Sequence, residues 1–326
     1  MHRTMAAALI LALASLALPG TPASAADWPD KPVRIIVPFP AGGATDMFGR
    51  VFAEQFSKTF GQQFYVENRA GGGGLIGSEA AARAAPDGYT LEISGIPSHV
   101  LAPAMNKNVS FDPIKDFTHI AYLGGPPNVF VVHPSLGVKT FKELLALMKS
   151  DPEGLQYVSP SIGSLGNMLA EAIADKEKVK LVHVVYRGGS VAIQDLVAGH
   201  VKVGSMAIST TRAHIAAGKL LPVAISSEKR LAEFPDMPTL VELGYPDLVA
   251  KTWFSLSGPA GLPRDIVDKL NAAVNKAITI PEVHQHLKNE MVETQAMTPE
   301  QITAFMQSEL NKWSPLGRRI SEQAKK

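Results

Sequence analysis

VPFPAGGATD, residues Val37 to Asp46, joins a predicted strand to a predicted helix. The β-branched run at 33–37 is typical of a buried strand. Two prolines and two glycines end it, and Thr45 is a good N-cap for the helix that follows. A strand that leads through a Gly-rich turn into a helix exposes unpaired backbone N–H groups. The stretch therefore predicts an α/β fold with a place for a phosphate, a carboxylate or no ligand at all.

The first 25 residues have the pattern of a cleavable secretory signal. His2 and Arg3 precede an apolar run at 5–18, and the small residues Ala23-Ser24-Ala25 follow it. The run is shorter than the roughly 20 residues that span a bilayer. We expect cleavage after Ala25 and export of a mature chain that begins near Asp27. A retained N-terminal anchor is the alternative.

Composition excludes several classes of function. The chain has 326 residues, a formal net charge of +1 and no cysteine. The missing cysteines rule out disulfides, thiolate metal sites and a cysteine nucleophile. The near-zero charge gives no electrostatic reason to expect nucleic acid or anionic lipid as a partner. About 300 mature residues favour two lobes over one core.

Strand-like and helix-like segments alternate from residue 33 to residue 226, which predicts mostly parallel sheets flanked by helices. Three helical stretches then follow at 264–278, 281–291 and 299–316. The segments 118–128 and 247–258 are the predicted crossings between two lobes. A helical tail of this length can pack back over the first lobe.

Motifs for catalysis or cofactors are weak. Gly72, Gly74 and Gly77 fit a dinucleotide fingerprint, with Glu92 about 20 residues on. Four consecutive glycines satisfy such a pattern by chance, and a tightly turned loop is the simpler interpretation. Around Ser164, an isoleucine replaces the first glycine of the nucleophile elbow. No metal-binding spacing of histidines or carboxylates occurs.

Small-residue turns between a strand and a helix recur at 40–46, 95–98, 159–166, 188–190 and 205–210. Ligands bind beyond the carboxyl ends of parallel strands, so these turns could meet across a cleft. They offer N–H donors and hydroxyl groups. The pattern favours binding of a small anion, although ordinary connections are also rich in glycine and serine.

A resemblance to a known family is carried by long motifs in order. WPDKPVRIIVPFPAGGATDMFGR at 28–50 resembles the opening of the Bug family, the extracytoplasmic receptors of tripartite tricarboxylate transporters. VENRAGGGGLIGSEAAARAAPDGYTL, FDPIKDFTHIAYLG, VVYRGGSVAIQDLVAGHV and WFSLSGPAGLPRDIVDKLN are further matches, and the similarity covers the mature chain.

The resemblance implies a periplasmic, cofactor-free binding protein, with no enzymatic activity, that closes two lobes about a hinge. Its fold would be the two-lobed type II periplasmic-binding-protein arrangement. The implied boundaries are 1–25 for the signal, 26–124 and 248–326 for lobe 1, and 125–247 for lobe 2. The implied partners are a small carboxylate and membrane permease subunits, and a monomer is expected.

The expected ligand-binding residues follow from the resemblance and the recurring turns. In the family, the loop from Phe39 to Thr45 grips a carboxylate through backbone N–H groups and water. The full set is Phe39, Pro40, Ala41, Gly42, Gly43, Thr45, Asp46, Ile96, Ser98, Ser159, Ser161, Ile162, Gly163, Ser164, Tyr186, Arg187, Gly188, Ser205 and Met206. Asn167, Lys202 and Pro97 depart from the family pattern near the expected cleft.

Charge narrows the expected ligand. Arg187 is the only cationic residue in the expected cleft turns, and helix N-termini supply only about half a unit of charge each. We expect a mono- or dicarboxylate with an apolar body, aromatic or medium-chain aliphatic, rather than citrate. Two alternatives remain: an exported α/β enzyme, either a dinucleotide-dependent oxidoreductase or a hydrolase, and a chemosensory receptor for a carboxylate.

Overall fold

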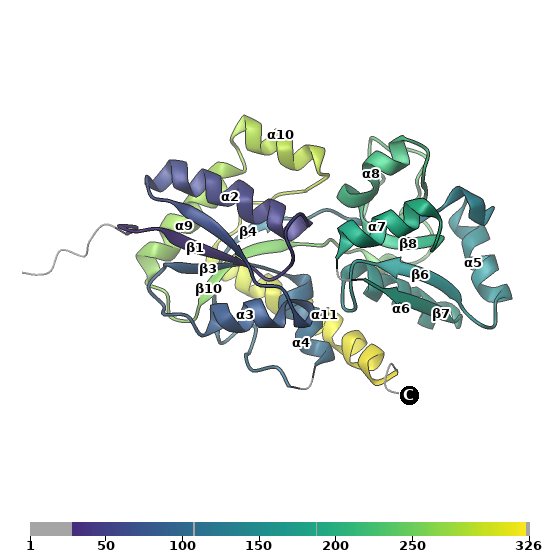
Figure 1. Cartoon of the computed structure of the whole chain (residues 1–326), viewed down its shortest axis with the longest axis horizontal. Helices are drawn as coiled ribbons and strands as arrows, with labels where there is room; N and C mark the ends of the chain where they lie inside the picture. The colour runs from purple at the N-terminus through teal and green to yellow at the C-terminus, as the bar shows by residue number, and fades with distance from the viewer. Residues whose placement is uncertain (1–27, 107, 187, 324–326) are drawn as a thin grey trace, which may run out of the picture.

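The computed structural model describes residues 28–106, 108–186 and 188–323. The predicted secretory signal and Arg187 lie outside the described residues. Two five-stranded sheets, each covered by helices, form two lobes that lie side by side (Figure 1). This confirms the predicted two-lobed α/β fold. Within the described residues, no helix is long and apolar enough to cross a membrane.

The sheet of lobe 1 has the strand order β2-β1-β3-β10-β4. Its strands are β1 (Val33–Val37), β2 (Phe64–Asn68), β3 (Thr90–Gly95), β4 (Phe117–Gly124) and β10 (Phe254–Pro259). Strands β1, β2 and β3 are parallel, whereas β10 returns from the second lobe and runs antiparallel to β3 and β4. The sheet is thus assembled from both ends of the chain.

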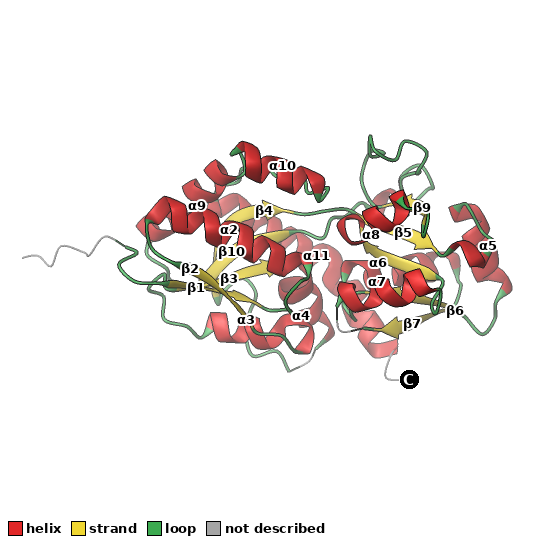
Figure 2. Cartoon of the chain, turned by 45° about the horizontal axis from the view of Figure 1, so that its top comes forward, coloured by secondary structure: helices red, strands yellow, loops and turns green. Residues whose placement is uncertain are grey.

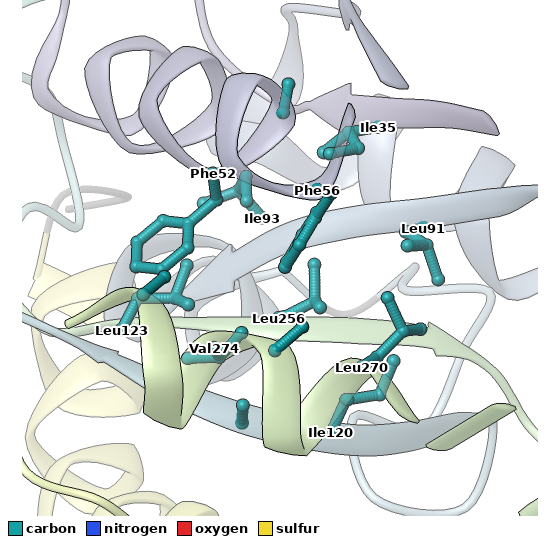
Figure 3. Packing of buried hydrophobic residues seen from close by; sticks show 14 of the residues in the cluster. Ile35, Phe52, Phe56, Leu91, Ile93, Ile120, Leu123, Leu256, Leu270 and Val274 are labelled. Carbon is teal, nitrogen blue, oxygen red and sulfur yellow. The ribbon is translucent and has the colours of Figure 1, made fainter. Parts of the chain in front are cut away.

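Helices cover both faces of this sheet. On one face α2 (Ala44–Phe60) and α9 (Arg264–Ala277) close the main core. Figure 3 shows Phe52 and Phe56 of α2 and Leu270 and Val274 of α9 packed with the strand residues. On the other face lie α3 (Leu75–Ala82), the π-helical turn η3 (Ile96–Leu101) and α4 (Ala102–Met105), next to the short 3₁₀ turn η2 (Gly72–Gly74).

Lobe 2 repeats the plan with the order β7-β6-β8-β5-β9. Its strands are β5 (Asn128–Val132), β6 (Leu155–Ser159), β7 (Leu181–Val185), β8 (Val203–Ala207) and β9 (Leu221–Ile225). Strand β5, the first after the crossing, is antiparallel to β8 and β9. Helices α5 (Phe141–Ser150) and α6 (Leu165–Glu177) pack on one face, and α7 (Gly189–Ala198) and α8 (Ile208–Ala216) lie by the other.

Two chain segments cross between the lobes and touch each other. Pro127 pairs with Lys251 in an isolated bridge. A Cβ on Gly125 would lie 2.3 Å from the Thr252 carbonyl oxygen, so only glycine allows the segments to approach this closely. We propose the lobe boundaries expected from the sequence, 26–124 with 248–326 for lobe 1 and 125–247 for lobe 2.

The C-terminal helices pack on lobe 1, as expected, but the last one also reaches lobe 2. Helix α10 (Pro281–Asn289) follows α9, and α11 (Pro299–Gln323) lies against α4, η3, β4 and α6 (Figure 2). Ser321 Oγ donates to the Met105 carbonyl in lobe 1 at 2.7 Å, and Arg319 pairs with Asp175 of α6 at 3.0 Å. Helix α11 therefore spans the junction of the two lobes, where Trp253 and Val249 of the second crossing segment also contact it.

Candidate ligand-binding site

A cleft with a volume of about 580 Å³ lies between the lobes. Among the expected binding residues, nine line it: Phe39, Pro40, Ala41, Gly42, Gly43, Thr45, Ser161, Ser164 and Gly188. More of the lining residues lie in the small-residue turns that the sequence indicated, among them Leu165, Ser190, Ser209 and Thr210. Further lining residues, which the sequence did not single out, include Met47, Asn128, Val191, Thr252, Phe254 and Glu290. Both lobes thus contribute, with small polar groups set among apolar side chains.

The first turn of α2 forms one wall of the cleft. The helix begins at Ala44 with Gly43 as N-cap, so the prediction of Thr45 as N-cap was wrong by two residues. Gly43 has no side chain to cap the helix, and no side-chain hydrogen bond replaces it. The first N–H groups of a helix have no acceptor within the helix. The N–H groups in the first turn of α2 are therefore available to an anion, and the helix dipole also favours a negative charge at this end.

Asp46 braces this loop from behind instead of lining the cleft. Its carboxylate accepts hydrogen bonds from the Gly42 N–H at 3.0 Å, from Arg50 Nε at 2.9 Å and from Asn68 Nδ2 at 3.0 Å. Asn68 Nδ2 also donates to the Phe39 carbonyl. Burial on its own would raise the pKa of Asp46, but the hydrogen bonds from Arg50, Gly42 and Asn68 lower the pKa below its usual value.

Replacing Asp46 by alanine is expected to lower the free energy of unfolding by about 2 kcal/mol at pH 7, because three donors lose a charged acceptor. Because the folded-state pKa is lowered, this contribution is present above about pH 4 and is lost as the pH falls further. Urea unfolding at pH 7 and pH 3 measures the difference from wild type. Glu54→Ala, which removes an exposed i,i+4 pair with Lys58 on the same helix, is the control and should change little. A difference as large at pH 3 as at pH 7 would contradict the role of the Asp46 charge.

The glycine run 71–74 supports the cleft loop by close packing. A Cβ on Gly74 would lie 2.8 Å from Ser98 Cβ and 3.1 Å from Phe39 Cζ, and one on Gly77 would lie 2.7 Å from Pro38 Cβ. These glycines let η2 and α3 pack against the loop. Glu92, the acidic residue of the supposed fingerprint, is fully buried and accepts a 2.6 Å hydrogen bond from Ser78 Oγ. It cannot reach a ribose, so the tightly turned loop is the better interpretation.

Glu92 belongs to a buried polar cluster under the cleft wall. Its Oε2 lies 3.7 Å from His99 Nε2 of η3, and His119 of β4 lies beside His99. Burial raises the pKa of Glu92 to about 8, against the opposing hydrogen bond from Ser78. Burial, and next the proximity of His119, lowers the pKa of His99 well below its usual value. Both groups are therefore neutral near pH 7.

The raised pKa of Glu92 predicts a pH-dependent stability. A raised folded-state pKa gives a contribution that is fully present below about pH 4.3 and is lost as the pH rises toward the folded-state value. Between pH 5 and pH 8.5 the free energy of unfolding of wild type should therefore fall relative to that of Glu92→Gln, which has no proton to lose. Urea unfolding at both pH values measures this, with the exposed Glu153→Gln as control. Parallel curves for wild type and Glu92→Gln would show that Glu92 does not titrate in this range.

In lobe 2, the loop before α6 is held by its own side chains. Ser164 caps α6 by accepting a hydrogen bond from the Asn167 N–H at 3.2 Å, and its hydroxyl donates to Ser159 Oγ at 3.0 Å. Asn167, where the family often has histidine, accepts from the Gly163 N–H and donates to the Tyr157 hydroxyl. The N–H donors of this helix are thus partly satisfied before any ligand arrives.

Helices α7 and α8 present their N-termini to the same cleft. Their N-cap residues, Gly188 and Ala207, make no side-chain capping hydrogen bond. Ser190 in the first turn of α7 and Ser209 and Thr210 in that of α8 line the cleft. Together with α2, three helices therefore direct their positive ends at one space. In α8 the first of these N–H groups is already used, because the Ile208 N–H donates to the Pro127 carbonyl at 3.0 Å.

Several expected site residues lie away from the cleft lining. Ile96, Ser98, Ser205 and Met206 are fully or almost fully buried in the lobes, and Gly163 faces Leu101, Ala102 and Met105 of lobe 1. The Tyr186 hydroxyl donates to Asp195, and Ile162 is exposed outside the lining.

Ser159 is buried behind the cleft, where it pairs with His183 Nε2 at 2.8 Å. Burial lowers the pKa of His183 to about 4, which makes it a poor general base for a serine that no substrate can reach.

Two α/β lobes, two crossing segments and an interlobe cleft edged by helix N-termini are the architecture of a solute-binding protein. The model of the tripartite tricarboxylate transporter family receptor matches residues 48–321, and the chain belongs to this family. The resemblance to the Bug receptors is thereby confirmed, and the members of this family are solute-binding receptors, not enzymes.

Individual relatives and solved structures are similar to this chain over most of its length. The chain is 32% identical to protein BugT of Bordetella pertussis over 305 residues, which cover 93% of this chain and 94% of BugT. The structure of R. palustris Rpa4515 with adipate is similar, with 28% identity, a TM-score of 0.84 and coverage of 90% of this chain and 98% of that one. MatC from Rhodopseudomonas palustris with bound malate has 29% identity, a TM-score of 0.82 and coverage of 89% and 100%.

Proposed function

We propose that the protein is exported by its N-terminal signal and, as a periplasmic monomer, captures a small mono- or dicarboxylate for the permease of a tripartite tricarboxylate transporter. The observation that carries the proposal is the uncapped first turn of α2, which opens directly into the interlobe cleft. Its N–H groups and dipole suit a carboxylate of the ligand. Closure of the lobes about the two crossing segments would then exclude water from the bound acid.

The rest of the lining favours an acid with an apolar body. Phe39, Met47, Leu165, Val191 and Phe254 face the cleft, and apolar side chains of this kind bury the hydrocarbon part of a ligand. The two similar proteins with named acids hold adipate and malate, both dicarboxylates. A second ligand carboxylate would find hydroxyl and N–H donors at the first turn of α7. Donors at two separate helix N-termini, those of α2 and α7, suit two ligand charges better than three.

Titration calorimetry of the mature protein with citrate, succinate, adipate and terephthalate tests the proposal. Adipate or terephthalate should bind, and bind more tightly than citrate, because the apolar body adds buried area and a third charge must lose its hydration. A thermal shift with each acid provides an independent check, since a ligand that binds only the folded state raises its melting temperature. Tight binding of citrate without binding of the apolar-bodied acids would show that the ligand class is wrong.

A further inference from the structure

Glu290 is the one ionisable side chain among the described residues that line the cleft. It directly follows α10 of lobe 1 and is half-buried. A carboxylate beside a site for carboxylates lowers the affinity of the ligand, because like charges repel in a space with little water. We propose that Glu290 acts as a charge filter, which lowers the affinity for an acid with each further carboxylate that the acid carries. This inference rests on the proposed function and deepens it.

The backbone on both sides of Glu290 is anchored, which fixes the point from which its side chain extends. Before it, the Asn289 carbonyl accepts a 3.0 Å hydrogen bond from Arg212 Nη1 of α8. After it, Met291 adopts the left-handed conformation with a φ of 56° and packs against the apolar cluster of lobe 2. Such a conformation is costly for a residue other than glycine and persists only where the surroundings fix it. Glu293 then pairs with Gly125 at the crossing.

The cation that interacts with Glu290 is already paired with another carboxylate. Hydrogen bonding to Glu233, and to a smaller extent the charge of Glu290, raises the pKa of Arg212. Arg212 Nε donates to both carboxylate oxygens of Glu233, at 2.7 and 3.0 Å, and Arg212 is not among the cleft-lining residues. The Arg212–Glu233 pair carries no net charge. The field of Glu290 therefore acts on the cleft with little compensation from this pair.

The place of Glu290 decides which part of the cleft an anionic group avoids. Because Arg212 of α8 holds the adjoining Asn289, Glu290 lies toward α8, whose uncapped first turn carries Ser209 and Thr210. That turn could attract an anion by itself. With Glu290 beside it, the α8 side suits a neutral group or a hydrogen-bond donor, and ligand charges go to α2 and α7. For an acid with three carboxylates, the third carboxylate would have to lie beside Glu290.

The test uses pentanoate, adipate and butane-1,2,4-tricarboxylate, which place one, two and three carboxylates on the same four-carbon chain. Calorimetry measures their affinities for wild type and for Glu290→Gln, which removes the charge and keeps the shape. The variant should raise the affinity for the tricarboxylate about tenfold more than the affinity for pentanoate, as expected for one repulsion at about 10 Å in a partly buried site. Glu282→Gln, an exposed change in the first turn of α10, is the matched control and should leave all three affinities unchanged.

The outcomes separate this inference from the proposed function. If the acids bind but Glu290→Gln changes all three affinities equally, or none, the charge filter is wrong and the carboxylate site stands. If none of the acids binds either protein, while thermal unfolding shows both to be folded, the proposed function fails and the inference fails with it. A gain that grows with the number of carboxylates supports both.

Discussion

Gly43→Asp is expected to abolish carboxylate binding without weakening the fold. Gly43 is the N-cap of α2 in an extended conformation, with φ −92° and ψ 175°, and the nearest atom to an added Cβ would be the Pro40 carbonyl oxygen at 3.8 Å. Aspartate fits there without strain, and it is among the best N-cap residues. Its carboxylate would occupy the N–H groups that the ligand needs and repel the ligand's own charge. An affinity loss of at least about 100-fold is expected from one such repulsion at close range.

Gly43→Asp is expected to lower the affinity for the acid while leaving the stability of the fold unchanged or raising it, and this combination makes the prediction specific. Calorimetry should show no binding of the best acid, while urea unfolding should show an unchanged or slightly higher free energy of unfolding. Gly43→Ala, which adds the same Cβ without a charge or a cap, is the control and should retain most of the affinity. A folded Gly43→Asp protein that binds as wild type does would remove the α2 turn from the site.

Gly166→Ala is expected to be the most destabilising small change in the cleft wall. A Cβ at this position would lie 1.9 Å from the Ser205 carbonyl oxygen and 3.0 Å from Asn128 Nδ2. The first atom belongs to the backbone of β8, so α6 must move away from the sheet to make room. Overpacking that displaces backbone costs about 3 kcal/mol, and urea unfolding should show a loss of that size.

Gly189→Ala is the matched control for this prediction. Gly189 also lines the cleft at the start of a helix, but its nearest neighbours to an added Cβ are at 3.7 Å or more. Alanine is the better helix former, so a change of less than about 1 kcal/mol in either direction is expected. Equal effects of the two substitutions would mean that the contact of α6 with β8 does not limit the fold.

The elements of the fold could be predicted because their signals are local. Alternating strand and helix patterns predicted both lobes, and three successive helical patterns predicted the C-terminal tail. Which sheet β10 joins could not be read from its own residues, because that depends on the chain crossing back between the lobes. The contact of α11 with α6 was missed for the same reason.

The candidate site was predictable where one stretch of chain forms it. The loop from Phe39 to Thr45 lines the cleft because a strand, a glycine turn and a helix follow one another there. In the turn after β8, the strand continues to Ala207, so Ser205 and Met206 are buried and Ser209 and Thr210 reach the cleft. The turn predicted at 205–210 therefore combined buried strand residues with helix residues that reach the cleft.

Thr252 and Glu290 carried no signal in the sequence. Thr252 comes from a crossing segment, where its hydroxyl donates to Asn128 Oδ1 at 2.9 Å across the two strands of the crossing. Glu290 follows a helix whose own pattern is that of an ordinary surface helix. Both reach the cleft through the arrangement of the lobes, which no short motif encodes.

A crystal structure of the mature protein with the tightest-binding acid of the calorimetric series tests the central claim most directly. The account predicts that a carboxylate of the acid lies at the first turn of α2, where an oxygen accepts a hydrogen bond at about 3 Å from the Ala44 or Thr45 N–H, directly or through one water. The apolar body should lie against Phe39 and Phe254. An acid bound in the cleft with no carboxylate at the α2 turn, or bound outside the cleft, would contradict it.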